Sequence, residues 1–141
     1  MAYNLKAMVV DDDEHVRTFL VVLVRKLVSG TVFEARNGLE AIEVYQEEKP
    51  ELILLDVNMP LLDGMATLER LKEINPEVVV IMITSLAMRR IVEEAVQGGA
   101  AHFIRKDTSK AQMIQIIKET VCHAYFPEQL AALEAEFAQN A

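Results

Sequence analysis

The sequence contains too little cysteine and too few long apolar runs for several classes of protein. Cys122 is the only cysteine, so no disulfide can form within the chain. The longest strictly apolar runs, at 19–24 and 78–83, have six residues each, whereas a membrane-spanning helix needs about 20. The first residues also lack the basic start and apolar stretch of a signal peptide. These absences predict a cytoplasmic protein with no membrane association.

Basic charge is also scarce. The 141 residues include 14 Lys plus Arg and 22 Asp plus Glu, which gives a net charge of −8. Because nucleic-acid backbones are bound by clustered Lys and Arg, we expect no direct contact with nucleic acid. With 52% hydrophobic residues, a chain of this length can build one self-sufficient core. Where the acidic residues lie then matters more than how many there are.

Five short apolar segments alternate with stretches of helical spacing. Each segment is flanked by polar or turn residues, as buried strands are; they lie at 5–10, 31–35, 52–55, 78–83 and 101–104. Two of the helical stretches carry apolar stripes, which we expect to face the sheet. The first stripe consists of Val16, Phe19, Leu20, Leu23 and Leu27, and the second of Met113, Ile116, Ile117 and Val121. The pattern predicts an α/β fold with a mostly parallel five-stranded sheet and helices on both faces.

Turn residues mark the ends of the other helices. Asn37-Gly38 precedes a helix that ends at Lys49-Pro50. Asn75-Pro76 and Gly98-Gly99 end two more helices, which begin near Met65 and Ala87. After residue 125, Pro127 can be the first residue of an extra C-terminal helix. Its narrow apolar stripe is Leu130, Leu133 and Phe137.

Acidic, hydroxyl and basic residues follow the predicted strands at the edge where parallel sheets bind ligands. Asp11 and Asp12 follow the first strand, Asp56 the third, Thr84 the fourth and Lys106 the fifth. Converging carboxylates repel one another unless a cation compensates them. Mg²⁺ prefers such oxygen ligands, and a carboxylate can attack phosphorus to form an acyl phosphate. The pattern therefore favours magnesium-dependent phosphoryl transfer, in which ammonium and hydroxyl groups help to neutralise charge.

Four fragments in this order carry a family resemblance. They are Met-Val-Val-Asp11-Asp12-Asp-Glu, Leu-Ile-Leu-Leu-Asp56-Val-Asn-Met-Pro-Leu-Leu-Asp-Gly64, Ile-Met-Ile-Thr84-Ser and Ala-His-Phe103-Ile-Arg-Lys106. Over residues 5–121 the chain resembles the receiver domain of two-component response regulators. The resemblance implies a flavodoxin-like, doubly wound sheet of strand order 2-1-3-4-5. It also implies that Asp56 accepts a phosphoryl group from a histidine kinase or a phosphotransfer protein.

The same resemblance assigns roles to the other residues. Asp11 and Asp12 form the acid pair that holds Mg²⁺, with Asp12, Asp56 and the backbone carbonyl of Asn58 as direct ligands. Lys106 pairs with the phosphoryl oxygens. Two switch residues are implied, Thr84, whose hydroxyl also bonds the phosphoryl group, and Phe103, which turns toward the vacated space. The change would reach the face made by the helix that begins near Ala87, the strand 101–104 and the helix that carries Met113.

The residues beside these motifs have simpler interpretations. Many relatives place a cis proline after the lysine, but Asp107 follows Lys106 here, so we do not expect a cis bond. Asp107 could instead cap the next helix, as we expect Asp13 to cap the first. Phe103 is as easily explained as plain core as by a switch role.

The leading hypothesis is a stand-alone switch, not an enzyme, that catalyses its own phosphotransfer and dephosphorylation. It would comprise a receiver domain at 1–125 and a helical tail at 126–141, and would act on a downstream protein target. The tail stripe could pack on the domain or pair two copies in a homodimer, or the tail could be the start of a linker in a longer protein. The main alternative is a receiver-like adaptor that is not phosphorylated. A flavodoxin-like electron carrier fits less well because the acidic first loop repels phosphate, and a haloacid dehalogenase-type phosphatase leaves Asp56 unexplained.

Overall fold

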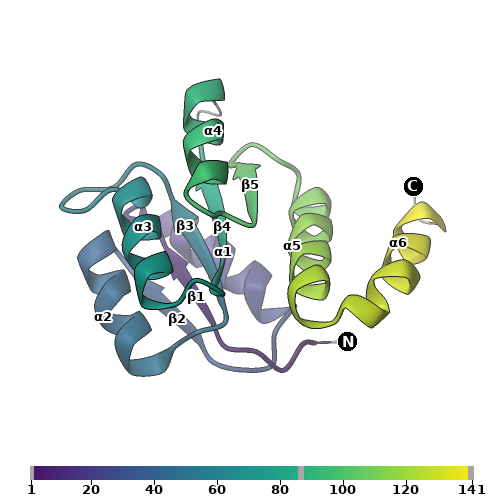
Figure 1. Ribbon diagram of the computed structural model, residues 1–141. Helices are drawn as coiled ribbons and strands as arrows, with labels where there is room; N and C mark the ends of the chain where they lie inside the picture. Colours follow the sequence, from purple (N-terminus) through teal and green to yellow (C-terminus); the bar gives the residue numbers. More distant parts are fainter. Residues whose placement is uncertain (1, 86–87, 140–141) are drawn as a thin grey trace.

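The computed structural model describes residues 2–85 and 88–139. Its centre is a five-stranded sheet in the order β2-β1-β3-β4-β5, with every neighbouring pair parallel (Figure 1). The strands are β1 (Ala7–Val10), β2 (Val32–Ala35), β3 (Leu52–Asp56), β4 (Val79–Thr84) and β5 (His102–Arg105). The predicted fold class and strand order are confirmed.

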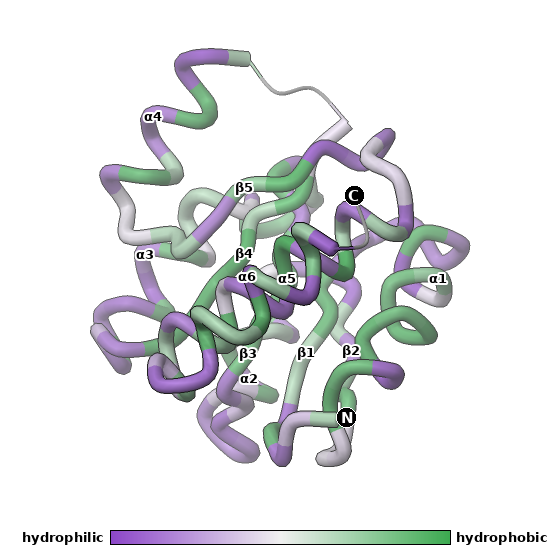
Figure 2. Tube along the Cα trace, turned by 90° about the vertical axis from the view of Figure 1, so that its right-hand side faces the viewer, coloured by the Kyte–Doolittle hydropathy of each residue, from purple (hydrophilic) through white to green (hydrophobic). Residues whose placement is uncertain are grey.

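Helices cover both faces of this sheet. They are α1 (Glu14–Arg25), α2 (Gly38–Glu48), α3 (Gly64–Ile74), α4 (Arg89–Gln97) and α5 (Lys110–Tyr125). The last helix, α6 (Leu130–Gln139), packs outside them against α5. Alternate residues of each strand enter two separate cores, because successive side chains point to opposite faces. In β1, Ala7 and Val9 join the core beneath α1 and α5, whereas Met8 and Val10 join the core beneath α2 and α3. The three central strands, β1, β3 and β4, are accordingly apolar along most of their length (Figure 2).

Four helices begin with a side-chain cap. Asp13 caps α1 as expected, since its carboxylate accepts hydrogen bonds from the amides of His15 and Val16. Asn37, Asp63 and Ser109 cap α2, α3 and α5. The expectation that Asp107 caps α5 is wrong: Ser109 lies three residues before the amide it accepts from, whereas Asp107 lies too far upstream and pairs with Arg105 at 2.9 Å. The described residues contain no cis peptide bond, in agreement with the absence of proline after Lys106.

Helix ends fall close to the predicted turn residues. Lys49 leaves the right-handed helical region and takes a left-handed conformation with φ of 47° before Pro50. Asn75 ends α3, and Gly98 ends α4. The predicted start of α4, near Ala87, lies outside the described residues.

The prediction that Phe19 faces the sheet is wrong. Its side chain is 45% exposed, although Leu20, Leu23 and Leu27 of the same stripe are buried. The buried face of α1 and the turn after it also includes Val21, Val24 and Val28. Because each residue turns a helix by about 100°, this face is centred too far around the helix to include Phe19.

The C-terminal segment folds back along α5. Pro127 opens a 3-10 turn, Pro127–Gln129, and α6 begins only after it (Figure 1). Of the predicted stripe, Leu133 is buried, while Leu130 and Phe137 are half-buried. The ring of Phe126 stacks on that of Tyr3 with their centroids 5.3 Å apart, which ties this end of α5 to the N-terminal segment. Within the described residues, no helix is long and apolar enough to span a membrane.

Candidate functional site

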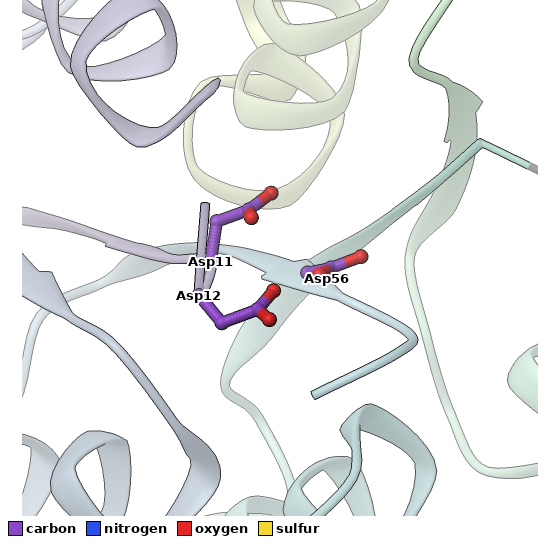
Figure 3. Close-up of side chains that lie close together, drawn as sticks. All are labelled: Asp11, Asp12 and Asp56. Carbon is purple, nitrogen blue, oxygen red and sulfur yellow. The ribbon is translucent and has the colours of Figure 1, made fainter. Parts of the chain in front are cut away.

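Three carboxylates meet where β1 and β3 end (Figure 3). Asp11 and Asp12 directly follow β1, and Asp56 is the last residue of β3, the strand beside it. Oxygens of the three carboxylates lie within 4.8 Å of one another. Asp11 is fully buried and Asp56 is 3% exposed, whereas Asp12 is open to solvent. The structure thus brings together the three acids on which the sequence-based interpretation depends.

Backbone contacts hold Asp11 in place. Its amide donates to the carbonyl of Ala35 at 3.1 Å, which continues the β1–β2 pairing by one residue. Its carboxylate accepts from the amide of Asp13 at 2.9 Å. Its carbonyl accepts from Nη1 of Arg17, whose Nε also pairs with Glu34 at 3.1 Å. Arg17 was not predicted as part of the site, although its place one helical turn after the Asp13 cap is a signal that could have suggested it.

Lys106 lies between the two buried carboxylates. Its Nζ is 3.0 Å from Oδ2 of Asp11 and 3.2 Å from Oδ1 of Asp56. Its amide donates to the carbonyl of Thr84 at 2.7 Å, which fixes the start of the loop after β5. Burial by itself would lower the pKa of Lys106, but the ion pairs with Asp11 and Asp56 outweigh it and raise the pKa. The Lys106 side chain therefore remains protonated at neutral pH.

The carboxyl group of Asp56 has a strongly raised pKa. Burial, followed by repulsion from Asp11, raises its pKa to about 6. Attraction to Lys106 and a hydrogen bond from the backbone amide of Asn58 act in the opposite direction. Lys106 therefore compensates the burial of Asp56 only in part.

The donor set fits a hard divalent cation. Oδ2 of Asp11 is buried, and the ammonium of Lys106, 3.0 Å away, is the only charge-compensating partner that the described residues give it. Three carboxylates around one lysine leave an excess of two negative charges at the strand ends. Mg²⁺ takes oxygen ligands and needs only one or two carboxylates, because water and phosphate oxygens complete its octahedron. Asp11, Asp12 and Asp56 could hold such an ion.

The remaining predicted residues surround this cluster at different depths. Thr84 ends β4 and is buried, and its neighbour Ile83 lies beside Asp56 in the sheet register. Phe103 of β5 is half-buried and packs against the core beneath α2 and α3. Asn58 is exposed in the loop after β3. The sequence had suggested only its carbonyl as a contact, and not the amide hydrogen bond to Asp56.

Comparisons with known proteins agree on one family. The model of the response regulator receiver domain matches residues 7–118. Chemotaxis protein CheY of Bacillus subtilis (strain 168) is 31% identical over 121 residues, which cover 86% of this chain and 99% of that protein. Sporulation initiation phosphotransferase F of the same organism is 35% identical over 103 residues, covering 72% and 82%.

Solved structures agree on the fold. A response regulator receiver domain protein (CheY-like) from Methanospirillum hungatei JF-1 superposes with a TM-score of 0.75 at 22% identity, over 96% of this chain and 99% of that one. That identity is low enough that the likeness concerns the fold alone, but the family model and the relatives carry the assignment further. The chain belongs to the family of response regulator receiver domains of two-component systems.

Proposed function

We propose that the protein is a phosphorylation-dependent signalling switch that accepts a phosphoryl group on Asp56. The observation that carries this proposal is a buried carboxylate at a strand end, 3.2 Å from an ammonium group and close to two further acids. An oxygen of Asp56 would attack the phosphorus of a phosphohistidine on a histidine kinase or a phosphotransfer protein. The P–N bond breaks, the imidazole leaves with the bonding electrons, and an aspartyl phosphate forms. Water later hydrolyses this anhydride to restore the carboxylate and release phosphate.

The neighbouring residues supply the charges that this transfer needs. Asp11, Asp12, Asp56 and the carbonyl of Asn58 would hold Mg²⁺, which neutralises phosphoryl oxygens when it is bound. Lys106 would pair with the oxygens of the incoming group, because its ammonium already lies between Asp11 and Asp56. The hydroxyl of Thr84 would bond another oxygen. With a pKa of about 6, Asp56 is mostly ionised at pH 7.5 and can act as the nucleophile.

The output would be a shift between two arrangements of the β4–α4–β5–α5 side of the molecule. Phosphorylation would draw Thr84 toward the site and let Phe103 turn inward. This side is loosely packed, since Ala95 is the only buried residue of α4 among those described. Segments with few buried contacts are the ones that move at low cost. The changed face of α4, β5 and α5 would bind a downstream protein target.

The non-phosphorylated adaptor remains the competing function, but no observation favours it, because the acids and the lysine expected of an active receiver lie together.

We further propose that residues 1–125 form the receiver domain and 126–141 a tail. Packing of Leu133 supports a tail docked on α5 of its own chain. Light scattering before and after truncation at Pro127 tests the homodimer alternative, since loss of a dimer on truncation would show that the tail pairs two copies.

Intact-mass measurement tests the phosphoacceptor directly. Incubation with acetyl phosphate and Mg²⁺ should add the mass of one phosphoryl group, and hydroxylamine should remove it because it cleaves acyl phosphates. Asp56→Asn should abolish the shift. Asp107→Asn is the matched control, because Asp107 is an exposed acid close to Lys106 in sequence and should leave phosphorylation intact. An unchanged mass of the wild type, or a shift that survives Asp56→Asn, would contradict the assignment.

A further inference from the structure

The first turn of α3 rests directly on the backbone of Asp56. Gly64 begins α3, and its amide donates to the carbonyl of Val57 at 2.8 Å. A Cβ atom on Gly64 would lie 2.2 Å from the carbonyl oxygen of Asp56, far closer than non-bonded atoms can approach. Only glycine allows α3 to begin this close to the end of β3. A shift of α3 would therefore be coupled to a shift of the Asp56 backbone.

The start of α2 makes an equally close contact with α3 and the loop before it. A Cβ atom on Gly38, the first residue of α2, would lie 2.1 Å from Oγ1 of Thr67 and 2.4 Å from the carbonyl oxygen of Leu62. Thr67 is fully buried, and its hydroxyl donates to the carbonyl of Asp63 at 2.7 Å. The first turn of α3 thus packs against both the end of β3 and the start of α2.

These contacts hold the loop between β3 and α3, residues 57–63, at both ends. At one end, Gly64 closes onto Val57. At the other, Gly38 touches Leu62, and Thr67 bonds to Asp63. Between these ends the loop carries Asn58, whose amide is hydrogen-bonded to the Asp56 carboxylate.

We propose that Gly38 and Thr67 are positioning residues of the phosphoacceptor site. They hold the 57–63 loop where Asn58 reaches Asp56 and can offer its carbonyl to Mg²⁺. Neither residue touches the carboxylates, so they act through the backbone of the loop and of α3. The part of the inference that concerns Mg²⁺ rests on the proposed function, whereas the placement of Asn58 does not. Mutation of residues that orient metal ligands without contacting the metal typically changes metal affinity by about 10–100-fold.

Four variants test this inference. Gly38→Ala adds the excluded Cβ, and Thr67→Val keeps the volume of Thr67 but removes its hydroxyl. Calorimetric titration with Mg²⁺ should show affinity weakened by about tenfold or more in both, whereas Thr67→Ser, which keeps the hydroxyl, should bind Mg²⁺ like the wild type. Asn37→Ala is the matched control, because it removes the α2 cap, a 2.9 Å hydrogen bond, without adding an atom against α3. It should lower the melting temperature and leave Mg²⁺ affinity unchanged.

The backbone amide resonance of Asn58, recorded in EDTA, separates this inference from the proposed function. Gly38→Ala and Thr67→Val should move that resonance, and Asn37→Ala and Thr67→Ser should not. If the wild type does not bind Mg²⁺, the metal site of the proposed function fails, and the Asn58 resonance still decides the positioning role. If Gly38→Ala does not fold, the Thr67 pair decides it. The inference is overturned if the folded variants melt earlier but keep both the Mg²⁺ affinity and the Asn58 resonance of the wild type.

Discussion

Neutralising Asp56 should stabilise the metal-free protein at neutral pH. Asp56 is 3% exposed, and burial followed by the charge of Asp11 raises its pKa from 3.8 to about 6. Between these two values the folded state binds more protons than the unfolded state, so stability falls as the pH rises through this window. The pKa difference corresponds to about 3 kcal/mol, since one pKa unit is worth about 1.4 kcal/mol. At pH 7.5, where Asp56 is mostly ionised in the folded state, the protein is destabilised by nearly this full amount.

Asp56→Asn replaces the carboxylate by a neutral group of nearly the same shape. Urea unfolding in EDTA at pH 7.5 should therefore show the variant more stable than the wild type by about 2–3 kcal/mol, with the same dependence on urea. The gap should shrink toward zero by pH 4, where the folded wild type carries a protonated Asp56. Asp107→Asn, at an exposed position, should show no such gain.

Added Mg²⁺ should narrow the gap at pH 7.5, because a ligand that binds the folded state stabilises the wild type by mass action. Equal stability of Asp56→Asn and the wild type in EDTA at pH 7.5 would refute the reasoning, since the buried charge would then have no cost.

Three further substitutions test the site and the contacts that stabilise the surrounding fold. Lys106→Met removes the cation between two buried carboxylates, so it should destabilise the protein by about 3–5 kcal/mol in urea at pH 7.5. The loss should be smaller at pH 4, where Asp56 is protonated in the folded state. Asp13→Ala removes the α1 cap and should lower the melting temperature without changing the phosphoryl mass shift. Tyr125→Phe removes a 2.7 Å hydrogen bond to the Glu51 carbonyl. Burial, followed by repulsion from Glu51, raises the pKa of Tyr125 from 10.0 to about 12. The stability advantage of the wild type over this variant should therefore fall as the pH rises from 10 to 12. A constant difference in unfolding free energy across that range would contradict the raised pKa of Tyr125.

The sheet and the acid cluster were predictable because both depend on local patterns. Short apolar segments separated by helical spacing define strands, and parallel strands must end at the same edge. Asp56 ends β3 and Lys106 directly follows β5, with β4 between the two strands. Although these residues are far apart in sequence, parallel strands end at the same edge of the sheet, and there the two side chains meet at 3.2 Å. The cap at Asp13 is also a local signal, since its carboxylate needs only the amides of the next turn.

The features that could not be predicted arise where elements pack against one another. Phe19 fits the apolar spacing of α1, but which side of a helix faces the sheet depends on neighbours that spacing does not reveal. Asp107 and Ser109 both precede α5, and only the actual start of the helix decides between them. The contact of Gly38 with Thr67 joins the starts of two helices, and the sequence around Gly38 contains no sign of it.

The site is held firmly on one side and loosely on the other, which predicts where a change at Asp56 is transmitted. On the α3 side, Gly64 lies against the backbone of Asp56, and the buried hydroxyl of Thr67 fastens the same turn. On the α4 side, the residue before the helix, Met88, gives it no side-chain cap, and Met88 and Val96 are exposed. A strain introduced at the end of β3 relaxes where the fewest contacts must break. We therefore expect amide hydrogen exchange of α4 to respond more strongly to beryllofluoride and Mg²⁺ than that of α3, and the reverse order would contradict both the switch direction and the positioning role of α3.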